Sequence, residues 1–456
     1  MSNMSQQSFN ITGLAGEKTL SGSVSIQGAK NSALKAMAVA ILFDGPVTLE
    51  NIPETADTQT MTEVLTKLGA KVNKIPVESE KSPEAVENVL TIDATGITST
   101  DIDPTLAGSM RASVVLTGPL LARFGKVSFP TPGGCVIGAR PIDLFIDGYR
   151  KMGAHIDEDK NSYYITAPNK LRETEIFFNK QTVGGTETLM MAAVLSKGIT
   201  VLKNCAMEPE IVNVAEWLNA CGADIRGVGT PTMEITGTNG KLLSAKKHPF
   251  VTIPDRVETG SFLLLGALCA RDLMITDCEP KHVESLINML KDSGVPVVVE
   301  PNVIKIVNNV APTSLLAPVA DIRTHEYPGF PTDLQSPLVA YLTQVNGESK
   351  VFETIYEGRY KYVEDLNKIG ANITFLNPRE IIVHGPTPFK SASETDPAQK
   401  TTLEARDIRA GFAVVMSALA GKGNFTITNV HLIDRGYEKL EQRLQALGAK
   451  IERKAD

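Results

Sequence analysis

Leu68-Gly69-Ala70-Lys71-Val72 is one of six similar segments in the chain. The other five are Met152-Gly153-Ala154-His155-Ile156, Cys221-Gly222-Ala223-Asp224-Ile225, Ser293-Gly294-Val295-Pro296-Val297, Ile369-Gly370-Ala371-Asn372-Ile373 and Leu447-Gly448-Ala449-Lys450-Ile451. Successive glycines of these segments lie 69 to 84 residues apart. A glycine followed by alanine is a common helix end, but six copies at near-even spacing indicate a repeated structural unit.

Each copy predicts the same local structure. The stretch Met61–Leu68, before Gly69, has apolar residues three or four positions apart, which is typical of an amphipathic helix. The glycine then ends the helix in the left-handed conformation. The alternating residues that follow predict a strand. Units of this length are small folds rather than solenoid turns, so six of them predict two domains of three units each.

A second kind of helix is predicted from runs of small and apolar residues. Residues 31–40 contain a single charged side chain, Lys35, and similar runs occupy residues 188–195 and 260–267. Helices that are apolar almost all round are buried in the core of a protein. We therefore expect these three helices inside the two domains.

The composition is that of a globular protein with more than one domain. The chain has 456 residues, 42% of them hydrophobic and 21% charged, with a net charge of −7. The negative charge argues against a nucleic-acid surface but leaves room for a local basic cleft. No apolar run approaches the roughly 20 residues of a membrane span, and residues 1–9 lack the apolar core of a signal peptide. We therefore expect a cytoplasmic protein without membrane insertion.

The cysteines and histidines give no support for a disulfide or a metal site. The five cysteines are Cys135, Cys205, Cys221, Cys269 and Cys278, and no two of them have CxxC spacing. The six histidines are scattered and form no HxxxH pair. We expect neither a protein metal site nor a cofactor.

The segment Pro132-Gly133-Gly134-Cys135-Val136-Ile137-Gly138-Ala139-Arg140-Pro141 is the main candidate for chemistry. Its three glycines cost conformational entropy on ordering, so such a loop usually serves mobility or close approach to a ligand. A thiol near a cation has a lowered pKa and can exchange a proton near neutral pH. The alternative is a tight turn with a buried cysteine.

Two further motifs combine a charged residue with glycine or proline. Lys30, in Gly28-Ala29-Lys30-Asn31, is expected at a helix N-terminus, where the backbone favours an anion. The alternative is a solvent-facing lysine. In Pro331-Thr332-Asp333, either polar side chain could instead cap the following helix.

Arginines recur in similar settings. Arg111 is expected to open an otherwise apolar helix, Arg359 follows Gly358, Arg409 lies two residues after Asp407, and Arg435 precedes Gly436. Each arginine alone is typical of a structural ion pair. Together with Arg140 and Lys30, they predict a cationic cleft for a small polyanionic substrate, because each charge-assisted contact contributes about 1.5–3 kcal/mol.

These motifs resemble those of the UDP-N-acetylglucosamine 1-carboxyvinyltransferase family of enolpyruvyl transferases, from Ile11 to about Arg453. The most specific matches are residues 28–31, 133–135, 138–141, 331–333 and 433–438. The resemblance implies an α/β fold, a two-domain inside-out α/β barrel in which each domain has three repeated βαβαββ units. It assigns residues 1–29 and 254–456 to a first, discontinuous domain. Residues 30–253 form the second, which carries the Gly-Gly-Cys loop, and the active site is expected in the cleft between the domains.

The same resemblance implies the reaction. Family members transfer the enolpyruvyl group of phosphoenolpyruvate to the 3-hydroxyl of UDP-N-acetylglucosamine and release phosphate, by addition and then elimination. This is the first committed step of peptidoglycan synthesis, which links the family to cell wall biogenesis, cell shape, the cell cycle and cell division. The family is also the target of fosfomycin.

The resemblance also implies residue roles. Cys135 is similar to the acid that protonates phosphoenolpyruvate, and Asp333 to the aspartate that receives the sugar hydroxyl proton. Lys30, Arg140 and Arg435 match groups that bind the phosphoenolpyruvate carboxylate and phosphate, with Asn31 beside them. The other implied contacts to substrate are Arg111, Pro141, Ile142, Asp143, Leu144, Lys180, Gln181, Thr182, Val183, Ile355, Arg359, Asp407 and Arg409.

Two other functions remain open. The shikimate-pathway enolpyruvyl transferase has the same fold, but it typically has Lys-Ser in place of Lys30-Asn31 and lacks the Gly-Gly-Cys loop. A non-catalytic paralogue that senses the nucleotide sugar is the other alternative, and the presence of Lys30, Cys135 and Asp333 counts against it. The sequence does not decide the oligomeric state or the regulation of the protein.

Overall fold

The computed structural model describes residues 7–78, 86–131, 142–245, 248–307, 316–394, 399 and 401–455. The described residues form two compact units. Residues 7–27 and 254–455 make up what we call the terminal unit, and the described part of residues 28–253 makes up the central unit. The chain leaves the terminal unit after Gln27, slightly before the predicted crossing at Lys30, and returns to it at Pro254.

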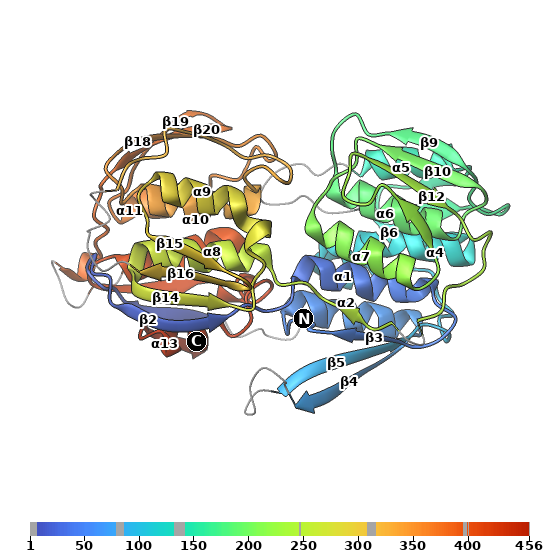
Figure 1. Ribbon diagram of the computed structural model, residues 1–456, viewed down its shortest axis with the longest axis horizontal. Helices are drawn as coiled ribbons and strands as arrows, with labels where there is room; N and C mark the ends of the chain where they lie inside the picture. Colours follow the sequence, from blue (N-terminus) through green and yellow to red (C-terminus); the bar gives the residue numbers. More distant parts are fainter. Residues whose placement is uncertain are drawn as a thin grey trace. The chain divides into compact units, whose positions relative to one another are not determined.

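Among its described residues, the terminal unit contains three four-stranded sheets (Figure 1). Their strand orders are β21(Thr401–Glu404)-β22(Asn424–Thr428)-β1(Gln7–Thr12)-β23(Lys450–Ala455), β15(Val297–Glu300)-β16(Val303–Val307)-β14(Ala270–Thr276)-β2(Leu20–Ser25), and β17(Asp321–Arg323)-β18(Gly347–Phe352)-β20(Glu380–Gly385)-β19(Asn372–Asn377). The α-helices are α8(Arg256–Cys269), α9(Glu284–Asp292), α10(Gln335–Leu342), α11(Val363–Lys368), α12(Ile408–Ala420) and α13(Leu440–Ala446).

The described part of the central unit has the same plan with one shorter sheet. The strand orders are β13(Phe250–Val251)-β3(Val47–Glu50)-β5(Val86–Asp93)-β4(Lys71–Glu78), β6(Lys126–Pro130)-β8(Ser162–Thr166)-β7(His155–Glu158), and β11(Asp224–Arg226)-β12(Thr232–Thr236)-β10(Ile199–Lys203)-β9(Thr174–Phe177). The α-helices are α1(Lys30–Val39), α2(Ala56–Leu68), α3(Pro104–Ser109), α4(Thr117–Phe124), α5(Asp143–Lys151), α6(Val183–Val194) and α7(Pro209–Ala220). In the three-stranded sheet, a single parallel bridge between Asp101 and Ser128 takes the place of a fourth strand.

The expected βαβαββ unit is confirmed, and it is clearest in the run β9-α6-β10-α7-β11-β12. β9 and β10 are parallel, whereas β12 pairs antiparallel with both β10 and β11. The two crossings exchange strands between repeats. β2 precedes α1 along the chain but pairs with β14, and β13 precedes α8 but pairs with β3.

Buried helices fill the centre of each unit. The three predicted core helices are α1, α6 and α8, and α4, α10 and α12 are of the same kind. In the terminal unit α8, α10 and α12 pack against one another, and the sheets lie outside them (Figure 1). These helices are apolar almost all round, so they are most stable when they are buried on every side. Placing the sheets outside the helices provides that burial.

The six repeated glycines have the predicted conformation. Their φ angles lie between 90° and 110°, each follows a helix, and each is followed within a few residues by a strand. The second and third residues of the motif therefore form the turn between the outer helix and the strand of each unit.

β4 and β5 pair antiparallel from Lys71↔Asp93 to Glu78↔Val86, and these two strands project from the central unit (Figure 1). Among the described residues, no helix is long and apolar enough to cross a membrane.

Candidate active site

In the central unit, Lys30 is the first residue of α1 and is 7% exposed, so the solvent-facing alternative is wrong. Its Nζ lies 3.1 Å from Oδ2 of Asp57, in the first turn of α2. A cation at a helix N-terminus opposes the helix dipole. The buried carboxylate of Asp57 offsets this cost and holds the lysine side chain in place.

Two neighbouring predicted residues lie on adjacent elements. Asn31 is half-buried at the start of α1, and Arg111 begins the short 3₁₀-helix η2 (Arg111–Leu116) rather than an α-helix. η2 packs against both α1 and α6, so these three elements belong to one packed group.

The segments predicted to contact the nucleotide sugar lead into two helices. Ile142 is buried and precedes α5, which begins with the exposed Asp143, followed by the half-buried Leu144. Thr182 caps α6, because its Oγ1 accepts from the Gly185 N–H at 3.1 Å.

The residues beside Thr182 differ in exposure. Gln181 donates through Nε2 to the Cys205 carbonyl at 3.0 Å. This bond ties the residue before the α6 cap to the segment that follows β10. Lys180 is exposed and Val183 is half-buried. Backbone N–H groups at helix starts favour anions, so the arrangement at α6 suits a phosphate-bearing ligand.

The Gly-Gly-Cys segment, with Cys135, Arg140 and Pro141, lies outside the described residues. The other four cysteines are buried and free. Burial raises the pKa of Cys205, Cys221 and Cys278 to about 11 and that of Cys269 to about 12. Since the thiolate is the reactive form, these four thiols are poor nucleophiles.

In the terminal unit, Asp333 is held by two arginines. Arg359 Nη2 lies 2.8 Å from its Oδ1, and Arg409 Nε lies 3.2 Å from its Oδ2. The arginine side chains are 2% and 4% exposed, whereas that of Asp333 is 29% exposed. The carboxylate is thus the accessible end of a buried cationic pair, and the two cations stabilise its ionised form.

The alternative that Asp333 or Thr332 caps the next helix is wrong. Asp333 lies within the 3₁₀-helix η5 (Thr332–Leu334), and α10 begins at Gln335 without a side-chain cap. The Thr332 hydroxyl donates to Glu353 Oε2 at 2.9 Å instead. Both side chains are therefore committed to tertiary contacts across the unit.

In the part of the chain that the structure describes, the guanidinium groups of Arg359 and Arg409 include nitrogen atoms that form no hydrogen bond. Among the described residues, Nε and Nη1 of Arg359 and Nη1 of Arg409 are buried without a hydrogen-bond partner. Burial alone lowers the pKa of Arg359, but Asp333, Asp407 and Glu353 outweigh it and raise that pKa above its ordinary value. Asp407 caps α12 through the N–H groups of Arg409 and Ala410. Buried donors of this kind suit an anionic ligand.

Arg435 lies in a turn that is anchored next to Arg409. Its predecessor Asp434 accepts from Arg453 at 2.7 and 2.8 Å. A Cβ placed on Gly436 would lie 3.4 Å from Arg409 Nη1, and the Arg409 guanidinium lies 5.4 Å from the centre of the Tyr437 ring. The turn therefore brings the half-buried Arg435 into the neighbourhood of the Asp333 cluster.

Sequence reasoning missed several buried acidic residues. Asp57 pairs with Lys30, Glu353 accepts from Thr332 and from the Ile355 N–H, and Glu187 pairs with Lys35 at 3.3 Å between α6 and α1. The only signal for Asp57 was an acidic residue at a helix start. A charged residue within an apolar run was the corresponding signal for Lys35.

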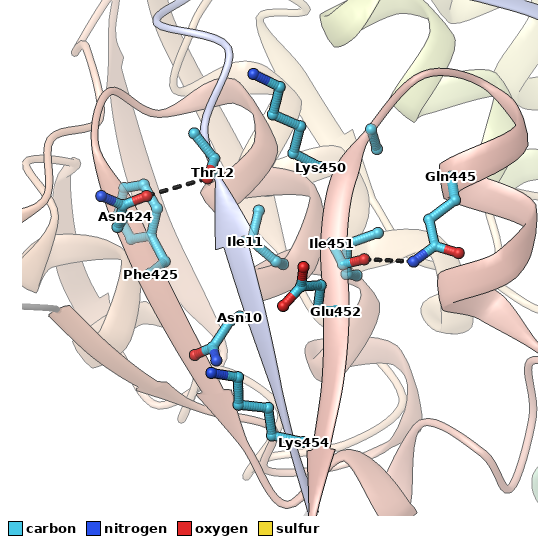
Figure 2. A pocket seen from close by; sticks show the side chains of 11 residues that line it. Asn10, Ile11, Thr12, Asn424, Phe425, Gln445, Lys450, Ile451, Glu452 and Lys454 are labelled. Atoms are coloured by element: carbon cyan, nitrogen blue, oxygen red, sulfur yellow. Dashed lines mark hydrogen bonds between the residues drawn. The ribbon is translucent and has the colours of Figure 1, made fainter.

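A hollow of about 470 Å³ lies elsewhere on the terminal unit, over β1, β22, β23 and the end of α13 (Figure 2). Thr12 donates to Asn424 on one side of it, and Gln445 donates to the Ile451 carbonyl on the other. None of the predicted site residues lines it, so its size alone does not connect it with the reaction. Within the described ranges, no group of three or more His, Cys, Asp or Glu residues could hold a metal ion.

Comparison with known proteins identifies the family of this chain. A family model described as EPSP synthase (3-phosphoshikimate 1-carboxyvinyltransferase) matches residues 14–444. The chain is 40% identical over 440 residues to the UDP-N-acetylglucosamine 1-carboxyvinyltransferase of Koribacter versatilis, covering 96% of this chain and 95% of that one. It is 39% identical over 440 residues to the protein of the same name from Desulforapulum autotrophicum, covering 96% and 98%. The chain belongs to the UDP-N-acetylglucosamine 1-carboxyvinyltransferase family.

Solved structures agree with this assignment at the level of the fold. The enolpyruvyl transferase NikO from Streptomyces tendae matches with a TM-score of 0.82 at 23% identity, over 99% of this chain and 100% of that one. An EPSP synthase from Acinetobacter baumannii matches with a TM-score of 0.69 at 17% identity, over 98% and 100%. As a member of the UDP-N-acetylglucosamine 1-carboxyvinyltransferase family, the chain is a transferase, and the family predicted from its motifs is confirmed.

Proposed function

We propose that this chain transfers the enolpyruvyl group of phosphoenolpyruvate to the 3-hydroxyl of UDP-N-acetylglucosamine, with release of phosphate, in the cytoplasm. The relatives that share about 40% of its sequence carry the name of this activity. The reaction opens peptidoglycan synthesis, so the chain would serve cell wall biogenesis and, through it, cell shape and division. Both substrates are small anionic molecules.

The observation that carries the proposal is the Asp333 carboxylate on two buried arginines. A hydroxyl that attacks phosphoenolpyruvate must lose its proton, and a partly exposed, ionised carboxylate can accept it. The unpartnered N–H groups of Arg359 and Arg409 supply positive charge beside that carboxylate. Positive charge there would stabilise the carboxylate and phosphate of the substrate as the addition proceeds.

The remaining roles are proposed from the family resemblance and from the charge of each residue. On the central unit, Lys30 would contact phosphoenolpyruvate, with Asn31 beside it, and the N-terminus of α6 would face the nucleotide diphosphate. On the terminal unit, Arg435 would add a cation near Arg409. Cys135 would protonate the methylene carbon, and Arg140 would hold the anion next to it. The proposed reaction therefore uses residues of both units, such as Lys30 of the central unit and Asp333 of the terminal unit.

A phosphate-release assay tests the proposal against its main competitor. The family model that matches the chain is described as EPSP synthase, which makes shikimate 3-phosphate the relevant second acceptor. With phosphoenolpyruvate present, UDP-N-acetylglucosamine should support phosphate release and shikimate 3-phosphate should not. Release with shikimate 3-phosphate alone would assign the chain to the other activity, and release with neither acceptor would favour a non-catalytic role.

A further inference from the structure

Glu353 is a carboxylate with no solvent exposure at the end of β18. Its Oε2 accepts from the Thr332 hydroxyl at 2.9 Å. Its Oε1 accepts from the backbone N–H groups of Ile355 at 2.8 Å and Tyr356 at 3.0 Å. One buried side chain therefore joins two separate turns of the terminal unit.

Both turns carry residues of the proposed site. Thr332 directly precedes Asp333, while Ile355 is a predicted contact to the nucleotide sugar and Arg359 follows it in the same segment. The Arg359–Asp333 ion pair closes the connection from the other side. The two turns are thus linked twice, once through Glu353 and once through the catalytic carboxylate itself.

The backbone of Glu353 is fixed as well as its side chain. Its N–H donates to the Arg379 carbonyl at 2.8 Å, and its own carbonyl accepts from Arg379 Nη1 at 3.2 Å. A second bond from Arg379 Nη1 reaches the Thr354 carbonyl at 3.0 Å. Arg379 thus fixes the backbone of Glu353, so the carboxylate reaches both turns from a fixed position.

A carboxylate has a consequence here that a neutral side chain would not have. A carboxylate has two acceptor oxygens, whereas an amide of the same shape has one. One oxygen of Glu353 accepts from the Thr332 hydroxyl, and the other accepts from two backbone N–H groups. This double attachment is better explained by a demand for precise placement than by the stability of either turn alone.

We propose that Glu353 is a positioning residue that holds Asp333 and the backbone at Ile355 in a fixed relation for the transfer reaction. The inference rests on the proposed function. A misplacement of about 1 Å in a reacting group can reduce the rate by about a hundredfold. Glu353 acts through Thr332 and the 355–356 turn and touches no substrate itself.

Three variants test this role. Glu353→Gln keeps the shape but places an amide N–H₂ toward Thr332, and Thr332→Val removes the hydroxyl at nearly constant volume. Thr332→Ser restores the hydroxyl and serves as the rescue. We expect kcat to fall about tenfold or more in the first two variants, with the KM for phosphoenolpyruvate nearly unchanged. The serine variant should stay within about threefold of the parent, on the scale that placement effects allow.

Asp365→Asn is the matched control. Asp365 is another fully buried carboxylate of the same unit, but it pairs with Arg406 at 2.8 Å and Lys368 at 2.9 Å and contacts neither turn. Its loss should lower the melting temperature and leave kcat within about twofold. If Glu353→Gln and Thr332→Val lower kcat no more than this control does, the positioning role is wrong.

The outcomes separate this inference from the proposed function. If the unmodified chain releases no phosphate from phosphoenolpyruvate and UDP-N-acetylglucosamine, the function itself fails. If it turns over normally and the variants behave like the control, only the role of Glu353 fails. Should Glu353→Gln not fold, the valine and serine variants at position 332 still decide the question.

Discussion

Asp333 has two duties at once. Its carboxylate is the candidate proton acceptor, and it is also the shared counter-ion of two almost fully buried guanidinium groups. Removing one partner of a buried ion pair leaves an uncompensated charge, which typically costs about 3–5 kcal/mol. Here Asp407 and Glu353 also raise the pKa of Arg359, so part of its positive charge stays compensated when Asp333 is neutralised. Chemistry and stability therefore cannot be separated by a stability measurement alone at this residue.

The first prediction concerns Asp333→Asn. The amide cannot accept a proton at neutral pH, so turnover should fall at least about a hundredfold, in line with general-base contributions. The melting temperature should fall too, because two buried arginines lose their anion. Kinetics, thermal melting and calorimetric titration with UDP-N-acetylglucosamine on the same preparation check this. Turnover within a few-fold of the parent would remove Asp333 from the mechanism.

The second prediction concerns the thiols. Burial raises the pKa of each of the four described cysteines to about 11 or 12, so few of them are thiolates at neutral pH. The epoxide fosfomycin should therefore alkylate Cys135 alone, and UDP-N-acetylglucosamine should speed the reaction. Peptide mass spectrometry locates the adduct. A modification on Cys205, Cys221, Cys269 or Cys278, or none at all, would contradict the assignment.

At the scale of elements, the six helix-ending glycines are not equivalent. All have positive φ, but their surroundings differ. A Cβ on Gly69 would lie 2.5 Å from the Gly96 carbonyl oxygen, whereas a Cβ on Gly222 would meet nothing within 4 Å. The repeat in the sequence predicts the common conformation, and only the packing of each unit decides how much room surrounds it.

This difference gives the third prediction. Gly222→Ala carries only the cost of a left-handed alanine, about 1–2 kcal/mol, whereas Gly69→Ala adds a clash with rigid backbone and should lose more. Both residues belong to the central unit, so urea unfolding of the two variants is a matched comparison. Equal losses would show that the neighbouring Gly96 segment moves freely and that the packing argument is wrong.

The ion pair between α1 and α6 gives the fourth prediction. Burial, opposed by Lys35 and supported by Glu210 and Glu208, raises the pKa of Glu187 from 4.5 to about 7. An acid with a raised pKa in the folded state binds its proton more tightly there than in the unfolded chain. Glu187 therefore favours folding least at high pH, and stability is lost as pH rises from about 4.5 to about 7.

Glu187→Gln should remove that part of the pH dependence. The difference between parent and variant should change by at most about 3 kcal/mol across this window, because one pKa unit corresponds to 1.36 kcal/mol. Urea midpoints at pH 5, 6, 7 and 8 measure it. Glu175→Gln, at an exposed glutamate of the same unit, should leave the profile unchanged. If both variants lose stability with rising pH as steeply as the parent does, the role of Glu187 is wrong.

At the scale of the whole molecule, more of the architecture than of the site could be predicted from the sequence. The repeated helix–glycine–strand pattern is local, so it predicted six units, and the apolar runs predicted the inner helices. The exchange of β2 and β13 between repeats is not local, and neither strand shows it in its own residues. The same limit applies to Asp57 and Glu353, whose partners come from other elements.

The motifs predicted which residue types belong to the site but not how they are paired. Arg359 and Arg409 were expected to contact substrate, and the structure shows that both also donate hydrogen bonds to Asp333. Lys30 was expected at a helix N-terminus that favours an anion, and Asp57 supplies an anion to Lys30 within the unit itself. A sequence pattern cannot show such pairs, because ion pairing depends on distances set by tertiary packing.

The most direct test of the central claim is the identity and isotope content of the product formed in D₂O. Addition of a deuteron to the methylene carbon makes a methyl group, and its rotation before elimination leaves some deuterium in the product double bond. We expect a UDP-N-acetylglucosamine derivative that carries an enolpyruvyl ether at the 3-hydroxyl, with deuterium at its methylene carbon, by NMR and mass spectrometry. Unmodified UDP-N-acetylglucosamine, an enolpyruvyl product only with shikimate 3-phosphate, or a product without deuterium would contradict the account.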